Sequence, residues 1–261
     1  MTAIDMVLRQ RAYFWTLFLR TWRGGIVSYT LLPVFFLLAM GLGLGGYVDR
    51  GPGDLGVTYL AFIAPGMLAT NAMTTAVGES TYPVWVAFKW EPVYTARIAT
   101  PLRVVDVLNG LVAYLAVRLT LTCAVMMVVL VAFGTVASVA GGVAAVLVGA
   151  LLGLAYAMPV LALSASIEDD TAFALLFRLG ILPMTLFSGA FFPISQLPGV
   201  LQAVAWLTPV WHGVESTRML TTDRVDALAL LGHLAYLALW VVAGWLLARS
   251  RFERRLADGG V

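Results

Sequence analysis

Six continuous apolar runs, each close to the length of a membrane-crossing helix, constrain this chain more than any other feature. A helix needs about 20 apolar residues to cross the roughly 30 Å hydrocarbon core of a bilayer. Of the 261 residues, 61% are hydrophobic and 11% are charged, whereas soluble domains carry about 25% charged residues. The runs lack the alternation typical of a membrane β-barrel. We therefore predict an all-α polytopic membrane protein with spans near 25–46, 58–80, 105–133, 141–164, 171–190 and 227–248.

Lysine and arginine residues predict that both ends of the chain are cytoplasmic, because these residues accumulate in short loops on that side of a membrane. Six crossings place most of them on one side: Arg9, Arg11, Arg20, Arg23, Lys89, Arg97, Arg103, Arg249, Arg251, Arg254 and Arg255. The other side then holds Arg50, Arg218 and Arg224. We expect a multi-pass protein of the cell membrane, with a cytoplasmic tail over 249–261 following the membrane domain of 25–248.

The first 24 residues are typical of an amphipathic helix that lies in the membrane interface. Polar positions recur on one stripe at three- and four-residue steps, and large apolar residues gather opposite. The apolar set is Ile4, Val7, Phe14, Trp15, Phe18 and Trp22. A merely polar leader with some aromatic residues is the alternative interpretation.

A charged insert over 85–103 separates the second and third spans and contains Lys89, the only lysine. Pro92 suits the first turn of a helix, and the residue before Pro101 is restricted, so the sequence predicts a short helix over 92–99. Aromatic residues are dense here: Trp85, Phe88, Trp90 and Tyr94. They either anchor the segment at the interface or enter a groove on a soluble partner.

An external segment over 191–220 is apolar but broken by Pro193, Pro198 and Pro209, so neither half is long enough to span. We predict a re-entrant helical hairpin, which a membrane tolerates only where it packs against protein. Ser195 and Thr208 are the expected N-cap residues. The candidate site residues of this hairpin are Phe191, Phe192, Pro193, Trp206 and Trp211.

Small residues recur at four-residue steps in the fourth predicted span, which lets helix backbones approach closely. These are Gly141, Ala145, Gly149 and Gly153. The stripe forms either internal packing, the more common case, or the contact between two copies.

Motifs for catalysis and nucleotide binding are absent from the sequence. There is no phosphate-binding GxxxxGK[ST] loop, no GxSxG and no HExxH. His212 and His233 do not have a metal-ligand spacing with cysteine. We expect no cofactor, no metal, no nucleic-acid partner and no ATPase site in this chain.

Two arginines lie inside predicted spans, where an ionised side chain is costly and therefore a functional candidate. Arg118 is expected at the depth of Thr70 and Asn71, and Arg178 lies two to three turns above an acidic turn over 168–170. The arginines either line a polar cavity or bind a headgroup, or they are structural. The acidic turn either is solvated, with Asp170 capping the next helix, or contacts a partner.

Three stretches resemble ABC type-2 exporter permeases, near the branch of nodulation protein J and the daunorubicin-resistance permeases. They are YLAFIAPGMLATNAM (59–73), WE…ATPLRVVDVL (90–108) and FSGAFFPISQLPGVLQAVAWLTPVWHGVESTR (187–218). The resemblance covers more than half of the chain, and the proline-broken third stretch is the most specific.

The resemblance implies two permease copies, as a homodimer, working with two cytoplasmic ATPase subunits that bind the ATP. It implies that 91–99 is the coupling helix that contacts the ATPase, with Glu91, Tyr94 and Arg97 as contacts. Segment 191–220 would cover the exit. The implied substrates are amphipathic: lipid-linked glycans, glycolipids or lipo-oligosaccharides, or alternatively drugs.

Two other classes of function remain as alternatives. An ion-coupled secondary transporter needs intramembrane acids, for which Glu79 is the candidate, and usually shows an inverted repeat, which is not apparent. A lipid-modifying membrane enzyme needs a nucleophile–base or metal pattern, and the sequence shows neither.

Overall fold

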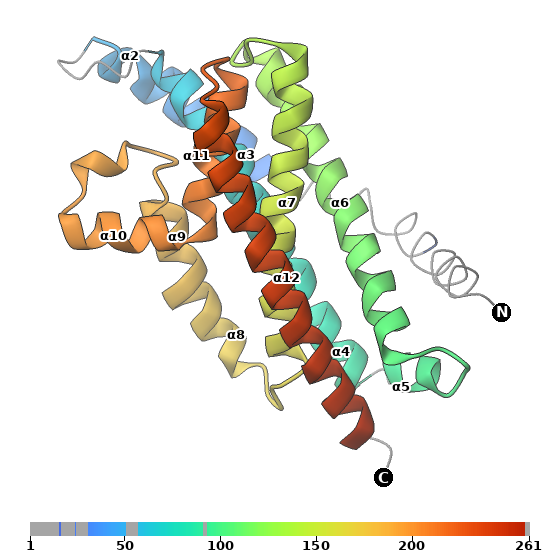
Figure 1. Ribbon diagram of the computed structural model, residues 1–261. Helices are drawn as coiled ribbons and strands as arrows, with labels where there is room; N and C mark the ends of the chain where they lie inside the picture. Colours follow the sequence, from blue (N-terminus) through green and yellow to red (C-terminus); the bar gives the residue numbers. More distant parts are fainter. Residues whose placement is uncertain (1–15, 17–23, 25–30, 51–56, 91–92, 259–261) are drawn as a thin grey trace.

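The computed structural model describes residues 16, 24, 31–50, 57–90 and 93–258. Across these residues every regular element is helical, as predicted (Figure 1). The predicted interfacial helix over 1–24 lies outside them, apart from two isolated positions. A helical stretch over 31–37 is followed by η1 (Leu38–Leu44), α2 (Gly45–Val48), α3 (Tyr59–Ser80), α4 (Tyr82–Lys89), α5 (Val93–Ile98), α6 (Val104–Ala132), α7 (Val139–Ser164), α8 (Thr171–Leu175), η2 (Leu176–Ile181), α9 (Leu182–Phe187), η3 (Ile194–Gln196), α10 (Gly199–Leu207), α11 (Pro209–Thr221) and α12 (Ala227–Asp258).

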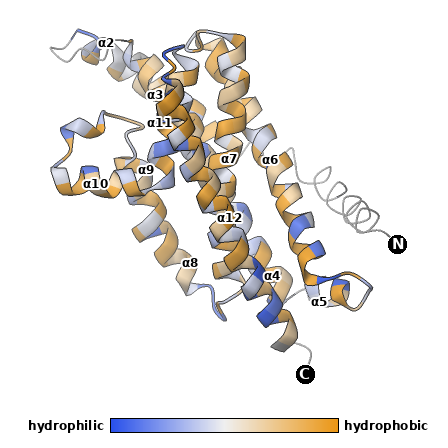
Figure 2. Cartoon of the chain, in the orientation of Figure 1, coloured by the Kyte–Doolittle hydropathy of each residue, from blue (hydrophilic) through white to orange (hydrophobic). Residues whose placement is uncertain are grey.

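Five helical segments in the described part of the chain are long and apolar enough to cross a membrane: Leu31–Val48, Tyr59–Lys89, Val104–Ala132, Val139–Ser164 and Ala227–Ala257. The predicted fifth span forms a shorter apolar helix, Thr171–Phe187. Figure 2 shows hydrophobic colour along most of α6, α7 and α12. The structure thus supports a multi-pass helical membrane protein, with five rather than six helices of full spanning length.

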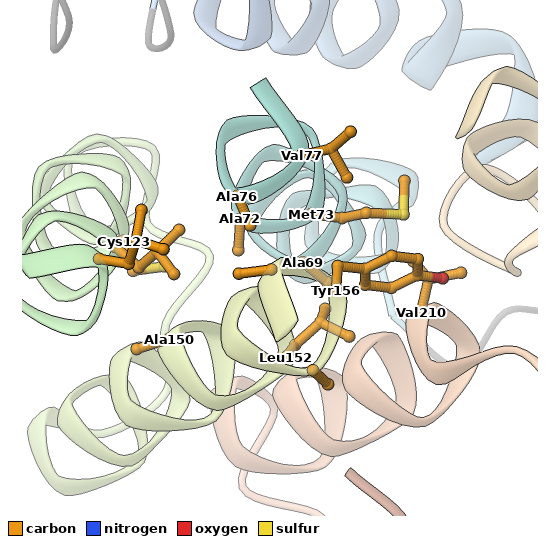
Figure 3. Close-up of a cluster of buried hydrophobic side chains, with 14 of the residues drawn as sticks. Ala69, Ala72, Met73, Ala76, Val77, Cys123, Ala150, Leu152, Tyr156 and Val210 are labelled. Atoms are coloured by element: carbon orange, nitrogen blue, oxygen red, sulfur yellow. The ribbon is translucent and has the colours of Figure 1, made fainter. Parts of the chain in front are cut away.

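The core lies where α3, α6, α7 and α11 meet, and alanine side chains lie there among larger ones (Figure 3). A Cβ atom added at Gly149 would lie 2.9 Å from the Sγ of Cys123, and one at Gly153 would lie 2.9 Å from Leu119, both on α6. A Cβ at Gly141 would overlap the carbonyl of Leu220 on α11. The small-residue stripe of α7 is therefore internal packing, the more common of the two predicted cases.

Helix α12 is the longest element and packs along α7. A Cβ atom at Gly244 would lie only 2.7 Å from Met158 and 2.8 Å from the Pro159 ring, so the two helices touch at the α7 proline. Further along α12, Ala248, Phe252 and Leu256 are buried at four-residue steps, which places them on one face. The predicted tail over 249–261 is therefore helical through Asp258.

The segment Thr171–Phe187 contains a six-residue π-helical stretch, Leu176–Ile181, followed by Pro183. Proline has no N–H, so the carbonyl four residues earlier cannot form the usual helical hydrogen bond. Single-turn π-helical insertions accommodate such a local change of hydrogen-bond register and occur frequently at functional sites. This part of the chain accordingly is helical without being a regular α-helix.

The segment over 191–220, which we call the outer segment after its predicted position, contains short helices interrupted at the predicted prolines. Thr208 occupies the N-cap of α11 with Pro209 in the first turn, as predicted, but its hydroxyl donates to the Ala205 carbonyl at 2.7 Å instead of capping. Ser195 is not the N-cap of α10, because Pro198 takes that position. Asp170 likewise precedes α8 without capping it through its side chain.

Candidate functional site

The insert between the second and third spans contains the short helix that the sequence predicted. Helix α5 lies between α4 and α6 at the same end of the molecule as the C-terminal end of α12 (Figure 1). Thr95 and Ala96 are exposed and Arg97 is half-buried. Glu91, the other predicted polar contact, lies outside the described residues.

Tyr94 faces the protein interior, not the exposed face of α5. Its ring centre lies 4.6 Å from that of Phe88 on α4 and 5.7 Å from that of Phe252 on α12. The Phe88 and Phe252 rings are 4.9 Å apart. The guanidinium of Arg97 lies 6.0 Å from the centre of the Tyr94 ring. The exposed contact surface of α5 is therefore formed by Thr95 and Ala96, with Arg97 at its edge.

The end of α4 contacts the acidic turn that follows α7. The Nζ of Lys89 donates to the Glu168 carbonyl at 2.5 Å and lies 5.1 Å from the centre of the Trp85 ring. Thr171 donates to the Asp169 carboxylate from its hydroxyl and from its backbone N–H, and these bonds hold the pKa of Asp169 below its usual value. Trp90 is the aromatic residue of this insert that stays mostly exposed, at 70%.

A buried ion pair connects α6 to α3. The Nη2 of Arg118 lies 2.8 Å from Oε1 of Glu79, and Nη1 of Arg118 donates to the Tyr114 hydroxyl at 3.1 Å. The side chains of the pair are only 9% and 13% exposed. The predicted depth of Arg118, that of Thr70 and Asn71, agrees with the packing, because Leu119 of α6 and Ala72 of α3 both adjoin Gly153. Its partner Glu79 lies further along α3, inside the membrane domain instead of at its edge, because the second span continues as helix through Lys89.

Arg178 lies in the π-helical stretch and is exposed. It has no hydrogen bond or ion pair with another of the described residues. Its neighbours Leu175, Leu179 and Leu182 are also 61%, 74% and 57% exposed. This helix therefore presents an apolar surface with one positive charge in it.

A second arginine, Arg218 of α11, joins three elements toward the end of the bundle opposite α5 (Figure 1), with its side chain 14% exposed. Its Nη2 donates to the Gly189 carbonyl at 2.6 Å, its Nη1 pairs with Glu215, and its guanidinium lies 4.0 Å from the centre of the Phe62 ring on α3. Gly189 has φ +79°, a conformation that side chains rarely adopt. Arg218 was not among the predicted site residues, although an acid three residues earlier is a recognisable helical ion-pair spacing.

Aromatic residues of the outer segment form a cluster with α12. The Nδ1 atoms of His212 and His233 lie 2.7 Å apart, and Nε2 of His212 lies 2.9 Å from the Trp206 carbonyl. Since a carbonyl only accepts, Nε2 of His212 carries hydrogen, and His233 donates from Nδ1 when both rings are neutral. The His212 ring stacks on Tyr236 at 4.0 Å, and Trp211 lies edge-on to both histidines.

The other predicted site residues of the hairpin lie around this aromatic cluster. Phe191 packs on Phe36 of the first helical stretch, with ring centres 5.1 Å apart. Phe192 is half-buried beside it, and Pro193 precedes η3. Trp206 is 48% exposed on α10 and lies 6.4 Å from Trp211, centre to centre. The structure thus brings Trp206 and Trp211 together and places Phe191 against a different helix.

Comparison with known proteins identifies the family. The profile of the ABC-2 type transporter family matches residues 11–221. The chain belongs to the ABC-2 type transporter family. It is similar to nodulation protein J of Rhizobium leguminosarum bv. trifolii, with 34% identity over 89% of this chain and 87% of that protein. It is also similar to nodulation protein J of Sinorhizobium fredii (32% identity, 86% and 84%) and of Bradyrhizobium diazoefficiens (29% identity, 96% and 97%).

As an ABC-2 type permease, the chain is a membrane transport subunit, and permeases of this family normally work with an ATPase subunit. The resemblance drawn from the three sequence stretches is confirmed. The family match includes the α5 insert, the Arg118–Glu79 pair and the outer segment, and ends before α12.

Proposed function

We propose that this chain is the membrane subunit of an ATP-driven exporter that moves an amphipathic substrate outward. Its partner would be a separate cytoplasmic ATPase subunit, present in two copies with two copies of the permease. The proposed substrate class is a lipid-linked glycan, a glycolipid or a lipo-oligosaccharide. The observation that carries this proposal is α5, a short helix that presents Thr95 and Ala96 at one end of a permease bundle.

Contacts at the two ends of the molecule support six crossings. Lys89 of α4 bonds the turn before α8, and Phe252 near the end of α12 contacts α4 and α5. The Tyr236 hydroxyl, nine residues after the start of α12, donates to Leu207 of α10 at 2.6 Å, and α11 then leads to the end opposite α5, where the Thr221 carbonyl accepts from the N–H of Ala137 before α7 (Figure 1). The chain between α8 and the end of α11 must therefore travel from one end to the other. The segment Thr171–Phe187 would reach about 26 Å, near the lower limit for a span.

The exposed face of this fifth segment supports a second permease copy beside it. An apolar surface with a lone arginine is costly against lipid alone. A second copy would cover the leucines, and the route between copies would hydrate Arg178 or supply it with an anionic group of the substrate. Arg118 has a different environment, because Glu79 already neutralises it. We assign Arg178 to the translocation route and Arg118 to the structure of the bundle.

The outer segment supports an amphipathic substrate. Exposed apolar residues of α10, including Leu207 at 69%, adjoin the polar edges of the cluster formed with His212 and Tyr236. A surface of this kind can contact both an acyl chain and hydroxyl groups. We propose that the hairpin of 191–220 is re-entrant and covers the exit.

Co-purification tests the proposal. The tagged chain is purified from membranes of its own host in the presence of ATP, and an ATPase subunit is expected in equal amount. Ala96→Glu is expected to reduce its recovery at least about tenfold, because losing about 1.4 kcal/mol of binding free energy has that effect. The matched control is Gln196→Glu, which adds the same charge at an exposed outer position and is expected to change nothing.

A permease that purifies alone, with the unaltered chain folded, contradicts the proposed function. Recovery unaffected by Ala96→Glu contradicts the assignment of α5 as the contact.

A further inference from the structure

The C-terminal end of α12 is built into the structure that holds α5. Phe252 is fully buried although it lies close to the end of the last helix. Its ring contacts Phe88 and Tyr94, and we call these three residues the α5 ring cluster. Ring centres 4.5–7 Å apart are typical of stabilising aromatic pairs. One ring comes from each of α4, α5 and α12, so the cluster joins the consecutive helices α4 and α5 to α12, which is distant in sequence.

A second set of contacts joins the same helices to the turn that leads into α8. Nη1 of Arg255 on α12 donates to the Ile167 carbonyl at 3.3 Å, and Lys89 of α4 donates to the next carbonyl along, that of Glu168. Both donors are side chains and both acceptors are backbone atoms. The turn between α7 and α8 is therefore held from both sides by the helices that carry the α5 ring cluster.

Helix α12 continues from this end along the bundle without interruption. Its buried stripe includes Gly244, which touches α7 at Pro159, and Leu237, which is fully buried. At the outer end its residues His233 and Tyr236 contact the outer segment. A displacement of α5 that carries Phe252 along would therefore reach the outer segment through one continuous helix.

We infer that Phe252 is a positioning residue that couples α5 to α12, so that the last span moves with the coupling helix. This inference rests on the proposed function. Motion of α5 would then reach the bundle through the contact with Phe252 as well as through the covalent connections of α5 with α4 and α6. The end of α12 would have a mechanical role that a solvated tail would lack. The α5 ring cluster keeps the two helices at a fixed separation while the ATPase subunits close.

Distance measurements between the two permease copies test this coupling. Cys123 is the only cysteine and is replaced by alanine. Single cysteines at the exposed positions Ala99→Cys, directly after α5, and Arg251→Cys then carry spin labels in the purified complex with the ATPase subunit. Pulsed electron paramagnetic resonance gives the distance between the two labels of a dimer, without nucleotide and after trapping with ATP and vanadate. We expect trapping to change the two distances, at 99 and at 251, in the same direction and by similar amounts.

Phe252→Ala is expected to leave the change at position 99 in place and to abolish the change at position 251. Phe252→Leu, which keeps most of the apolar volume, is expected to restore it in part. Leu247→Ala is the matched control, because Leu247 is 46% exposed on the same helix, and it is expected to behave like the unaltered chain. If Phe252→Ala only damaged the fold, the distance changes on trapping would be lost at both positions or kept at both.

The outcomes separate the two proposals. If trapping changes the distance at position 99 but not at 251 in the chain with native Phe252, α12 does not follow α5 and the inference is wrong. This measurement requires no variant of Phe252, so it tests the inference even if Phe252→Ala does not fold. If position 99 does not change either, the coupling role of α5 fails, and with it the proposed function.

Discussion

At the scale of single residues, Arg118 and Arg218 in the apolar bundle each have an acidic partner and a second oxygen acceptor. Arg118 meets Glu79 and the Tyr114 hydroxyl, and Arg218 meets Glu215 and the Gly189 carbonyl. Removing one partner of a buried ion pair leaves an uncompensated charge, which is far more costly than removing both. The contribution of each pair is therefore visible only when single and double substitutions are compared.

We predict that Arg118→Gln and Glu79→Gln each lower the free energy of unfolding by about 3–5 kcal/mol, the usual cost of breaking a buried pair. The double substitution is expected to recover most of this loss, because it leaves two neutral amides. Unfolding in a denaturing detergent, followed by circular dichroism, measures all four proteins of the cycle. Additive losses would show that the two side chains do not interact. ATP-dependent transport retained by the double variant would confirm that Arg118 is structural.

The costly arginine could be recognised from the sequence, but its partner could not. An arginine in the middle of an apolar run stands out by composition alone, whereas Glu79 looked like the last residue of its span. Its depth depends on α4, which continues the helix beyond Ser80. Tyr94 is a similar case, because the ring that buries it belongs to Phe252, distant in sequence. Contacts between residues that are distant in the chain leave no local pattern in the amino-acid sequence.

At the scale of elements, helix boundaries were predictable wherever a long apolar run ended at a polar or turn-forming residue. The predicted second, third and fourth spans agree with α3, α6 and α7 to within two residues. The end of α12 was missed, because charged residues follow Ala248 and indicate a tail. The buried four-residue stripe of Ala248, Phe252 and Leu256 was the signal that could have extended the helix.

The outer half of α3 touches the turn after α9 so closely that a methyl group does not fit. A Cβ atom at Gly66 would lie 2.6 Å from the Cα and 2.7 Å from the carbonyl oxygen of Ala190. We predict that Gly66→Ala lowers the free energy of unfolding by about 1–3 kcal/mol, the usual cost of overpacking. Gly232→Ala in α12 is the control, since a Cβ there meets no atom within 4 Å and alanine favours the helix. The same detergent unfolding assay compares them, and equal stability of the two variants would contradict this contact.

At the scale of the whole molecule, the arrangement follows from where the charged ends of the helices meet. The insert with Lys89, the turn before α8 and the arginine-rich end of α12 contact one another, and the charge pattern had predicted the same side for all three. Charge placement is readable from the sequence because the membrane separates two aqueous sides. How closely these segments pack was not readable, because it depends on single contacts between distant residues.

Labelling of cysteines in intact cells tests this arrangement. In a chain with Cys123→Ala, Val225→Cys is placed in the turn before α12, and Trp90→Cys and Arg254→Cys at the opposite end, all at exposed positions. With six crossings, a membrane-impermeant maleimide is expected to label position 225 from outside, and positions 90 and 254 only after permeabilisation. If the segment Thr171–Phe187 did not cross, positions 225 and 254 would exchange sides while position 90 stayed inside. Labelling at 254 in intact cells would therefore exclude the sixth crossing and move the end of α12 away from α5, against the contacts of Phe252.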